Sequence, residues 1–238
     1  MHENNWRQFD VASLIISPIR KMKQLFVILA AGTFIACQSA PKADKAQTSE
    51  AQQATTASGT IFKIDSSSAL SWVATKQTGQ HNGIFKLVDG VLNVDGNNLT
   101  GGTFTISVAD LAVLDLTGED KGKLEGHLKS ADFFEVDKHP AAKFEITKVE
   151  SYDSSKGATT LDGATHFISG NLTLKDSTRN VTFPAKVTIE GGAVSAQADF
   201  NIDRTNWGLN YKGPNSPQDW FIRKEVNLKL DVKAQPFK

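Results

Sequence analysis

The chain has 238 residues, of which 39% are hydrophobic and 22% charged, and its 26 basic residues equal its 26 acidic residues. This balance is typical of a globular protein and lacks the basic surface that nucleic-acid binding requires, so we expect no nucleic-acid partner. Cys37 is the single cysteine, which excludes an internal disulfide framework and a cysteine-rich metal site.

The first 36 residues are typical of a targeting segment and are not expected to belong to the fold. Residues 1–21 are interpreted as an upstream leader that comes from a start codon assigned too early. Residues 22–36 begin with basic character and continue as an apolar run. This run is shorter than the ~20 residues of a membrane-spanning helix, as is typical of a signal peptide.

Ala36 directly before Cys37 resembles the lipobox of bacterial lipoproteins. The resemblance implies lipid attachment at Cys37 and a bacterial cell-envelope protein that is anchored to a membrane and faces the periplasm. The alternative is a simple signal peptide that leaves Cys37 as a free thiol. Residues 37–58 contain almost no large apolar side chain, which predicts a disordered tether between this anchor and the domain.

From residue 59 to residue 238 the dominant pattern is alternation of apolar and polar residues, which predicts strands with one buried face. Short turn signals, such as residues 88–90 and 190–192, separate the runs. We therefore predict one all-β domain of about eight to ten antiparallel strands. The expected strands cover residues 69–74, 84–87, 91–94, 103–108, 143–149, 167–174, 181–189, 194–203 and 226–232.

One stretch in the middle of the domain departs from this alternation. Residues 119–130 are charged and place Leu124 and Leu128 one turn apart, which predicts a short helical connection with one buried contact. Phe133 and Phe134 follow directly. Two interpretations stay open: the two rings plug one end of a barrel, or they line the entrance to a cavity.

Several motifs in and around this stretch follow one another in a specific order. They are Gly83-Ile84-Phe85, His127-Leu128-Lys129-Ser130, Asp132-Phe133-Phe134, His139-Pro140, Gly170-Asn171-Leu172-Thr173-Leu174, Thr178-Arg179-Asn180-Val181 and the segment from Phe200 to Gly208. These motifs resemble those of YceI-like proteins, a polyisoprenoid-binding family with a lipocalin-like barrel. Gly126 and Asp176 depart from the residues that the family often has at these positions. The resemblance implies an extended antiparallel barrel around a long apolar tunnel that holds a polyprenyl chain.

A tunnel of this kind needs inward side chains that contact the ligand and inward positions that leave space. Small residues in the apolar phase, Ala74, Ala185, Ala196 and Ala198, favour a cavity over a filled interior. We predict that the ligand-binding residues are Trp72, Phe85, Phe104, Ile106, Phe133, Phe134, Leu172, Leu174, Phe183, Phe200, Ile202 and Arg204.

Arg204 is the charged member of this set. Counting by twos along the strand from Val194 leads to Arg204, so its guanidinium follows the buried face. A buried charge needs a carboxylate, a ring of carbonyls, water or an anionic ligand group. Two interpretations of Arg204 therefore stay open. It forms a salt bridge at the barrel rim, or it contacts the polar or phosphorylated head group of a ligand at the open end of the tunnel.

Residues 206–221 predict a long loop that contains Trp207, Tyr211, Trp220 and Phe221. Long loops in compact domains are usually functional. Either Trp207 caps the barrel and the rest is exposed, or the aromatic residues form a lid over the lipid entrance.

Catalysis finds little support in the sequence, and we predict no enzyme, no catalytic residue and no metal site. The five histidines lack metal-binding spacing, and there is no Gly-x-Ser-x-Gly motif. His127 and His166 are expected to be hydrogen-bonded structural groups. An enzyme whose residues come from distant strands would leave no such motif.

The expected function is therefore to bind or carry a long-chain isoprenoid or similar apolar lipid, with a polyisoprenoid or quinone-like molecule in place of a cofactor. Two alternatives stay open: an enzyme that acts on such a lipid, and a structural or stress-protective envelope protein whose barrel is filled. The family contains dimers, so the resemblance also admits a homodimer.

Overall fold

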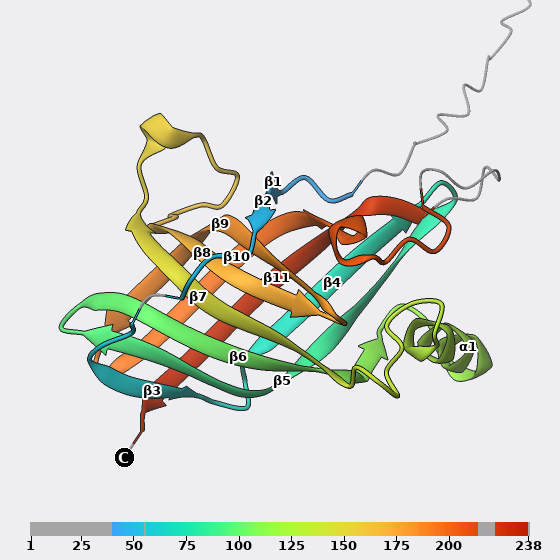
Figure 1. Cartoon of the computed structure of the whole chain (residues 1–238), viewed down its shortest axis with the longest axis horizontal. Helices are drawn as coiled ribbons and strands as arrows, with labels where there is room; N and C mark the ends of the chain where they lie inside the picture. Colours follow the sequence, from blue (N-terminus) through green and yellow to red (C-terminus); the bar gives the residue numbers. More distant parts are fainter. Residues whose placement is uncertain (1–39, 55, 214–221, 238) are drawn as a thin grey trace, which may run out of the picture. The chain divides into compact units, whose positions relative to one another are not determined.

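The computed structural model describes residues 40–54, 56–213 and 222–237, which form a set of strands with one α-helix outside them (Figure 1). The elements are β1 (Asp44–Lys45), β2 (Gln47–Glu50), β3 (Thr60–Ile64), β4 (Ala69–Lys76), β5 (Gly79–Asp95), β6 (Asn98–Val113), α1 (Gly118–Lys129), β7 (Ala141–Ser151), η1 (Ser154–Lys156), β8 (His166–Leu174), β9 (Ser177–Glu190), β10 (Ala193–Asp203), η2 (Arg204–Trp207) and β11 (Ile222–Pro236).

The strands close into an antiparallel barrel. Successive pairings join β5 through β9 in chain order, β9 pairs with β10, and β10 pairs with β11. β3 and β4 together occupy the remaining place, because both pair with β11 on one side and with β5 on the other. The result is a closed eight-stranded barrel with extra strands and one short helix, which confirms the predicted fold class.

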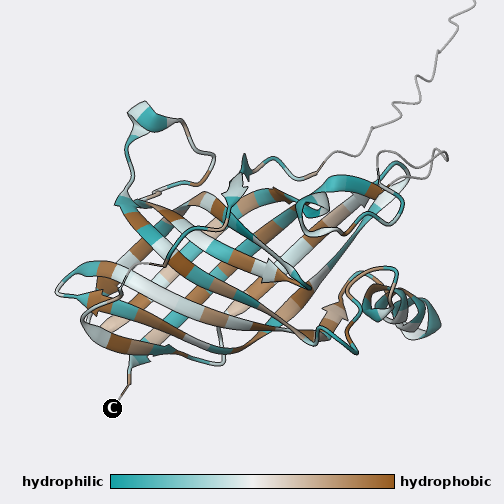
Figure 2. Cartoon of the chain, viewed as in Figure 1, coloured by the Kyte–Doolittle hydropathy of each residue, from teal (hydrophilic) through white to brown (hydrophobic). Residues whose placement is uncertain are grey.

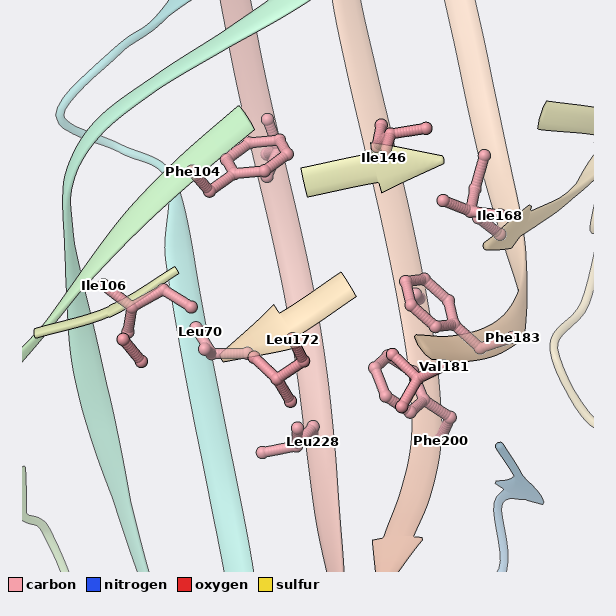
Figure 3. Packing of buried hydrophobic residues seen from close by; sticks show 14 of the residues in the cluster. Leu70, Phe104, Ile106, Ile146, Ile168, Leu172, Val181, Phe183, Phe200 and Leu228 are labelled. Carbon is pink, nitrogen blue, oxygen red and sulfur yellow. The ribbon is translucent and has the colours of Figure 1, made fainter. Parts of the chain in front are cut away.

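The barrel interior is formed by one phase of the alternation. Figure 2 shows that apolar and polar residues alternate along the strands. Successive side chains of a strand point to opposite faces, so every second residue enters the interior. Figure 3 shows the outcome for Phe104, Leu172, Phe183 and Phe200, whose side chains come from four different strands and lie in one apolar cluster.

The interior glycines make room for aromatic rings. A Cβ added to Gly90 would lie 2.8 Å from the ring of Phe104, and one added to Gly170 would lie 2.2 Å from the ring of Phe144. Each ring therefore occupies the space that a side chain at the glycine would fill, an arrangement that compensates for the missing side chain of a strand glycine.

The predicted helix is confirmed as α1, and it is tied to the barrel by one polar contact and two leucines. Leu124 and Leu128 pack against the apolar core. The Glu125 Oε1 atom accepts a hydrogen bond from the Val113 backbone N–H at 2.9 Å, which joins the helix to the last residue of β6. None of the helices in the described ranges has the length and hydropathy needed to cross a bilayer.

Residues 40–54, which we call the strap, differ from the predicted disordered tether. β1 pairs in parallel with β10, and β2 pairs antiparallel with β9. Composition predicted disorder because it measures apolar burial, whereas the strap is held mainly by backbone hydrogen bonds and by side-chain amides. The prediction was wrong for these residues. The predicted signal peptide and Cys37 lie outside the described part of the chain.

Candidate binding cavity

Two apolar chambers lie end to end inside the barrel. The upper chamber, on the side of α1, has a volume of about 100 Å³, and the lower chamber has about 60 Å³. Both are smaller than the ~300–1,000 Å³ of typical small-molecule sites. The side chains shared by both chambers, which form the passage between them, are Leu70, Ile106, Leu172 and Leu228.

The chambers end where the barrel is filled by its own side chains. Along β10, Ile202 lines the upper chamber, Phe200 lines the lower chamber, and Val194 lies beyond both, in the packed core. Leu92 and Val232 are likewise buried in the core and line neither chamber. The cavity is therefore closed at this end.

All of the predicted ligand-binding residues lie in the walls of these chambers, although their contact with a ligand stays a prediction. The upper chamber is lined by Trp72, Phe85, Ile106, Phe133, Phe134, Leu172, Leu174, Ile202 and Arg204. The lower chamber is lined by Phe104, Ile106, Leu172, Phe183 and Phe200.

The sequence reasoning missed other wall residues, most of which share the same alternating phase. Leu70 is two residues before Trp72 and Val108 is two residues after Ile106, and both line the upper chamber. Strict use of the alternation would have found them. Leu209 gave no such signal, because it follows η2 and belongs to no strand.

The expectation that small inward residues open the cavity holds for one of the four alanines. Ala74 lines the upper chamber, whereas Ala185, Ala196 and Ala198 line neither chamber. The last three instead pack in or against the core, so their small size serves close packing.

An aromatic cluster forms one wall of the upper chamber. The ring of Phe85 lies 6.3 Å from that of Trp72 and meets Phe134 edge-on at 5.8 Å. Phe133 lies 5.4 Å from Phe134. The two phenylalanines after α1 therefore line the upper chamber, which both the plug and the entrance interpretations allow.

Arg204 is held by a ring of backbone carbonyls. Its Nε donates to the carbonyl of Arg223 at 3.2 Å, and its Nη2 donates to Tyr211 and Ile222, each at 3.0 Å. Nη1 donates to Leu209. These bonds occupy four of the five N–H donors of a guanidinium. The side chain is 2% exposed, and burial lowers the pKa of Arg204.

The salt-bridge interpretation of Arg204 was wrong. The neighbouring carboxylate, Asp203, binds Lys224 at 3.0 Å instead. Arg204 also lies 5.6 Å above the ring of Phe133, so the cation forms part of the upper-chamber wall. Because its donors are mostly occupied, Arg204 has little capacity left for an anionic head group.

Buried polar atoms without a hydrogen-bond partner in the described residues mark the wall around the upper chamber. Trp72 Nε1 is one such atom, and Trp72 itself lines the chamber. Nε2 of His127 is another; its ring packs 4.4 Å from Tyr211. The prediction that His127 is hydrogen-bonded is wrong for Nε2. His166 does have a partner, Thr165, at 2.8 Å, and burial lowers the pKa of His166.

The described part of the loop at 206–221 closes onto the barrel. Trp207 is buried, and its Nε1 donates to the carbonyl of Leu172 at 2.8 Å, as expected for a cap. Trp220 and Phe221, which carried the lid hypothesis, lie outside the described residues. Within the described ranges, no group of three or more His, Cys, Asp and Glu residues is arranged to hold a metal ion.

Comparison with known proteins agrees with this geometry. A UPF0312 protein of Pectobacterium carotovorum is 32% identical over 150 residues, which cover 63% of this chain and 64% of that protein. A UPF0312 protein of Ectopseudomonas mendocina is 35% identical over 109 residues, 46% of this chain and 50% of the relative. The chain thus matches somewhat less than two thirds of the length of these relatives.

Two solved structures share the fold. BcnA of Burkholderia cenocepacia superposes with a TM-score of 0.55 at 20% identity, over 72% of this chain and 99% of that one. A polyisoprenoid-binding domain of Saccharophagus degradans, implicated in plant cell wall breakdown, gives 0.52 at 14% identity, over 74% and 98%. The profile of the YceI-like domain matches residues 51–234. The chain therefore belongs to the YceI-like family.

Proposed function

We propose that the barrel binds a long apolar lipid, of the isoprenoid class, along its two chambers. The observation that carries the proposal is the apolar character of both walls, which expose carbon atoms and no polar atom of the described residues. Two chambers end to end suit an elongated hydrocarbon tail, whose burial contributes about 25 cal/mol for each Å² removed from water. The polyisoprenoid-binding domain of S. degradans, which has the same fold, supports this ligand class.

The upper chamber favours a neutral head group with an acceptor oxygen. Arg204 is the charged residue among the described lining residues, and its N–H groups are largely bound to carbonyls. Trp72 Nε1 is a buried donor without an acceptor. Leaving such a donor unpaired costs about 1–3 kcal/mol, and a ligand carbonyl or hydroxyl would recover this energy once the indole turns its N–H towards the chamber. A quinone-like ring meets these requirements better than a diphosphate.

We further propose that the protein acts as a carrier or reservoir and not as an enzyme, and that a lipid on Cys37 holds it in the bacterial envelope. The resemblance of residues 36–37 to a lipobox supports the anchor. Turnover of the bound lipid would favour the enzyme alternative. A barrel that remains well folded and empty would favour the structural one.

Mass spectrometry of an organic extract of the purified protein tests the proposal. We expect a prenyl lipid in about one-to-one ratio with the protein. Ala74→Phe places a ring in the upper chamber and should lower the bound amount at least ten-fold without loss of stability. Ala69→Phe is the matched control, because Ala69 lies on the same strand at an exposed position. A folded parent protein that yields no lipid and takes up none when incubated with menaquinone-4 would contradict the proposal.

A further inference from the structure

The barrel wall has a seam between β9 and β10. These strands pair with each other only through Lys186–Glu190 and Ala193–Gln197. Their other partners, β8 and β11, stay paired with them well beyond this region. Residues 177–185 of β9 and 198–203 of β10 therefore present backbone edges that do not pair with each other.

The strap occupies this seam. β2 pairs with residues 179–182 of β9, and β1 pairs with residues 200–201 of β10, so consecutive strap residues bind the two separated edges. Ala46, between the two short strands, donates its N–H to the Asn201 carbonyl at 2.9 Å and is 4% exposed. Figure 1 shows β1 and β2 beside β9 and β10.

The seam lies beside the lower chamber. Val181, Phe183 and Phe200 line this chamber, and they belong to the unpaired stretches of β9 and β10. The rings of Phe183 and Phe200 stack 4.0 Å apart and 7° from parallel (Figure 3). At the seam, side chains thus bridge the two strands from inside the barrel, while the strap bridges them from outside.

The strap is held mainly by polar contacts. Asp44 accepts hydrogen bonds from the Thr159 hydroxyl and the Thr160 N–H, and Asn171 exchanges two hydrogen bonds with the backbone of Gln52. Asn201 Nδ2 donates to the carbonyls of Pro41 and Ala43 at 3.0 and 3.2 Å. Glu50 forms an ion pair with Arg179, and the Glu50 side chain is 85% exposed. Exposed ion pairs contribute roughly 0–1 kcal/mol, and segments with little buried apolar surface open at low free energy. Of the hydrophobic residues in the strap, Ala46 is the buried one.

We propose that the seam is the lateral access route to the lower chamber for a lipid tail, and that the strap is its removable closure. The upper end offers a poorer route, because Phe133, Leu209 and Arg204 cover it and are 8%, 4% and 2% exposed. On the inner side of the seam, Val181 and the stacked Phe183 and Phe200 rings line the lower chamber, so release of the strap would expose this part of its wall. This inference rests on the proposed lipid-binding function.

A reversible cross-link tests the route. Glu50 and Arg179 are paired across β2 and β9, so their Cα atoms lie at the ~4.5–5.5 Å of strand partners, within disulfide reach. The pair Glu50→Cys with Arg179→Cys is built in the full chain with Cys37→Ser, which leaves no other thiol. The control is Lys186→Cys with Gln197→Cys, which links β9 to β10 where they already pair.

The readout is the rate at which menaquinone-4 enters and leaves, followed by quenching of tryptophan fluorescence. We expect the oxidised strap cross-link to slow both rates at least ten-fold with unchanged binding at equilibrium, and dithiothreitol to restore them. The control pair should match the parent. Equal rates with the strap cross-linked and reduced would overturn the lateral route, whereas a parent protein that binds no lipid would overturn the proposed function instead.

A second measurement needs no ligand. Hydrogen exchange should show amides of residues 44–50 exchanging through a local opening, at least 100-fold faster than amides in the pairing of β8 with β9. If the strap amides exchange only as fast as those of β8, the strap opens only when the barrel unfolds. That result would overturn a removable closure whether or not lipid binds.

Discussion

At the residue scale, Asp203 joins two elements through one carboxylate. Its Oδ1 caps η2 by accepting from the Thr205 N–H at 3.1 Å, and its other oxygen binds Lys224 of β11 at 3.0 Å. Burial acts to raise the pKa of Asp203, but the hydrogen bonds from Thr205 and Lys224 and the charge of Lys224 outweigh it, and the pKa is lowered overall. The ionised form therefore stabilises the fold.

This lowered pKa predicts a pH-dependent stability. The contribution is fully present well above the unfolded pKa of about 3.9 and is lost as the pH falls through the folded value. Asp203→Asn keeps a capping oxygen and should cost about 1 kcal/mol at pH 7, and the difference should shrink as the pH falls through the lowered folded pKa. Urea unfolding from pH 3 to 7 measures it. Asp162→Asn, at an exposed position, serves as the control, and a difference that is constant with pH would disprove the role of the charge.

Trp72 leads to a prediction about the head group. Trp72→Phe removes the unpaired N–H and keeps an aromatic ring, so the free energy of unfolding should stay within about 1 kcal/mol of the parent. Affinity for menaquinone-4, which has acceptor oxygens, should fall about five- to ten-fold, whereas affinity for squalene, a hydrocarbon, should not fall. Fluorescence and lipid-partition measurements compare the two. An equal loss for both lipids would assign Trp72 to packing alone.

At the element scale, the position of α1 depends on one hydrogen bond to the end of β6 and not on the helical propensity of its own residues. Glu125 accepts from the Val113 N–H at 2.9 Å, while Glu119 forms an exposed ion pair with Lys123 at 2.8 Å. Glu125→Ala should destabilise the protein by about 1–2 kcal/mol, because the Val113 N–H loses its partner. Glu119→Ala should cost under about 0.5 kcal/mol. Equal shifts in the urea midpoint would disprove this assignment.

The elements differ in how well the sequence predicted them, and the reason is the force that forms each one. Barrel strands such as β10 follow alternation, because burial of one face selects every second residue. β1 and β2 carry little apolar surface and form because the unpaired edges of β9 and β10 bind their backbones. No local pattern in residues 44–50 reports that distant edge, so the strap could not be predicted.

At the scale of the whole molecule, the position of the cavity could be predicted and its ends could not. Alternation and the resemblance placed Trp72, Phe104 and Phe200 on the inner face, where the structure has them. The carbonyl ring around Arg204 arises from backbone atoms of residues 209, 211, 222 and 223, which come from two separate segments of the chain. Side-chain identity carries no information on such backbone acceptors.

The clamp of Asn201 on Pro41 also limits the geometry of attachment to a membrane. Pro41 is four residues after Cys37 (41 − 37 = 4). An extended chain spans at most about 3.6 Å per residue, so Cys37 lies no more than about 14 Å from Pro41. A lipid on Cys37, as proposed, would therefore hold the β9–β10 side of the barrel close to the bilayer surface. The distance from the surface would be at most about half of the ~30 Å thickness of the hydrocarbon core. The seam lies on this side of the barrel, within reach of a tail that leaves the membrane.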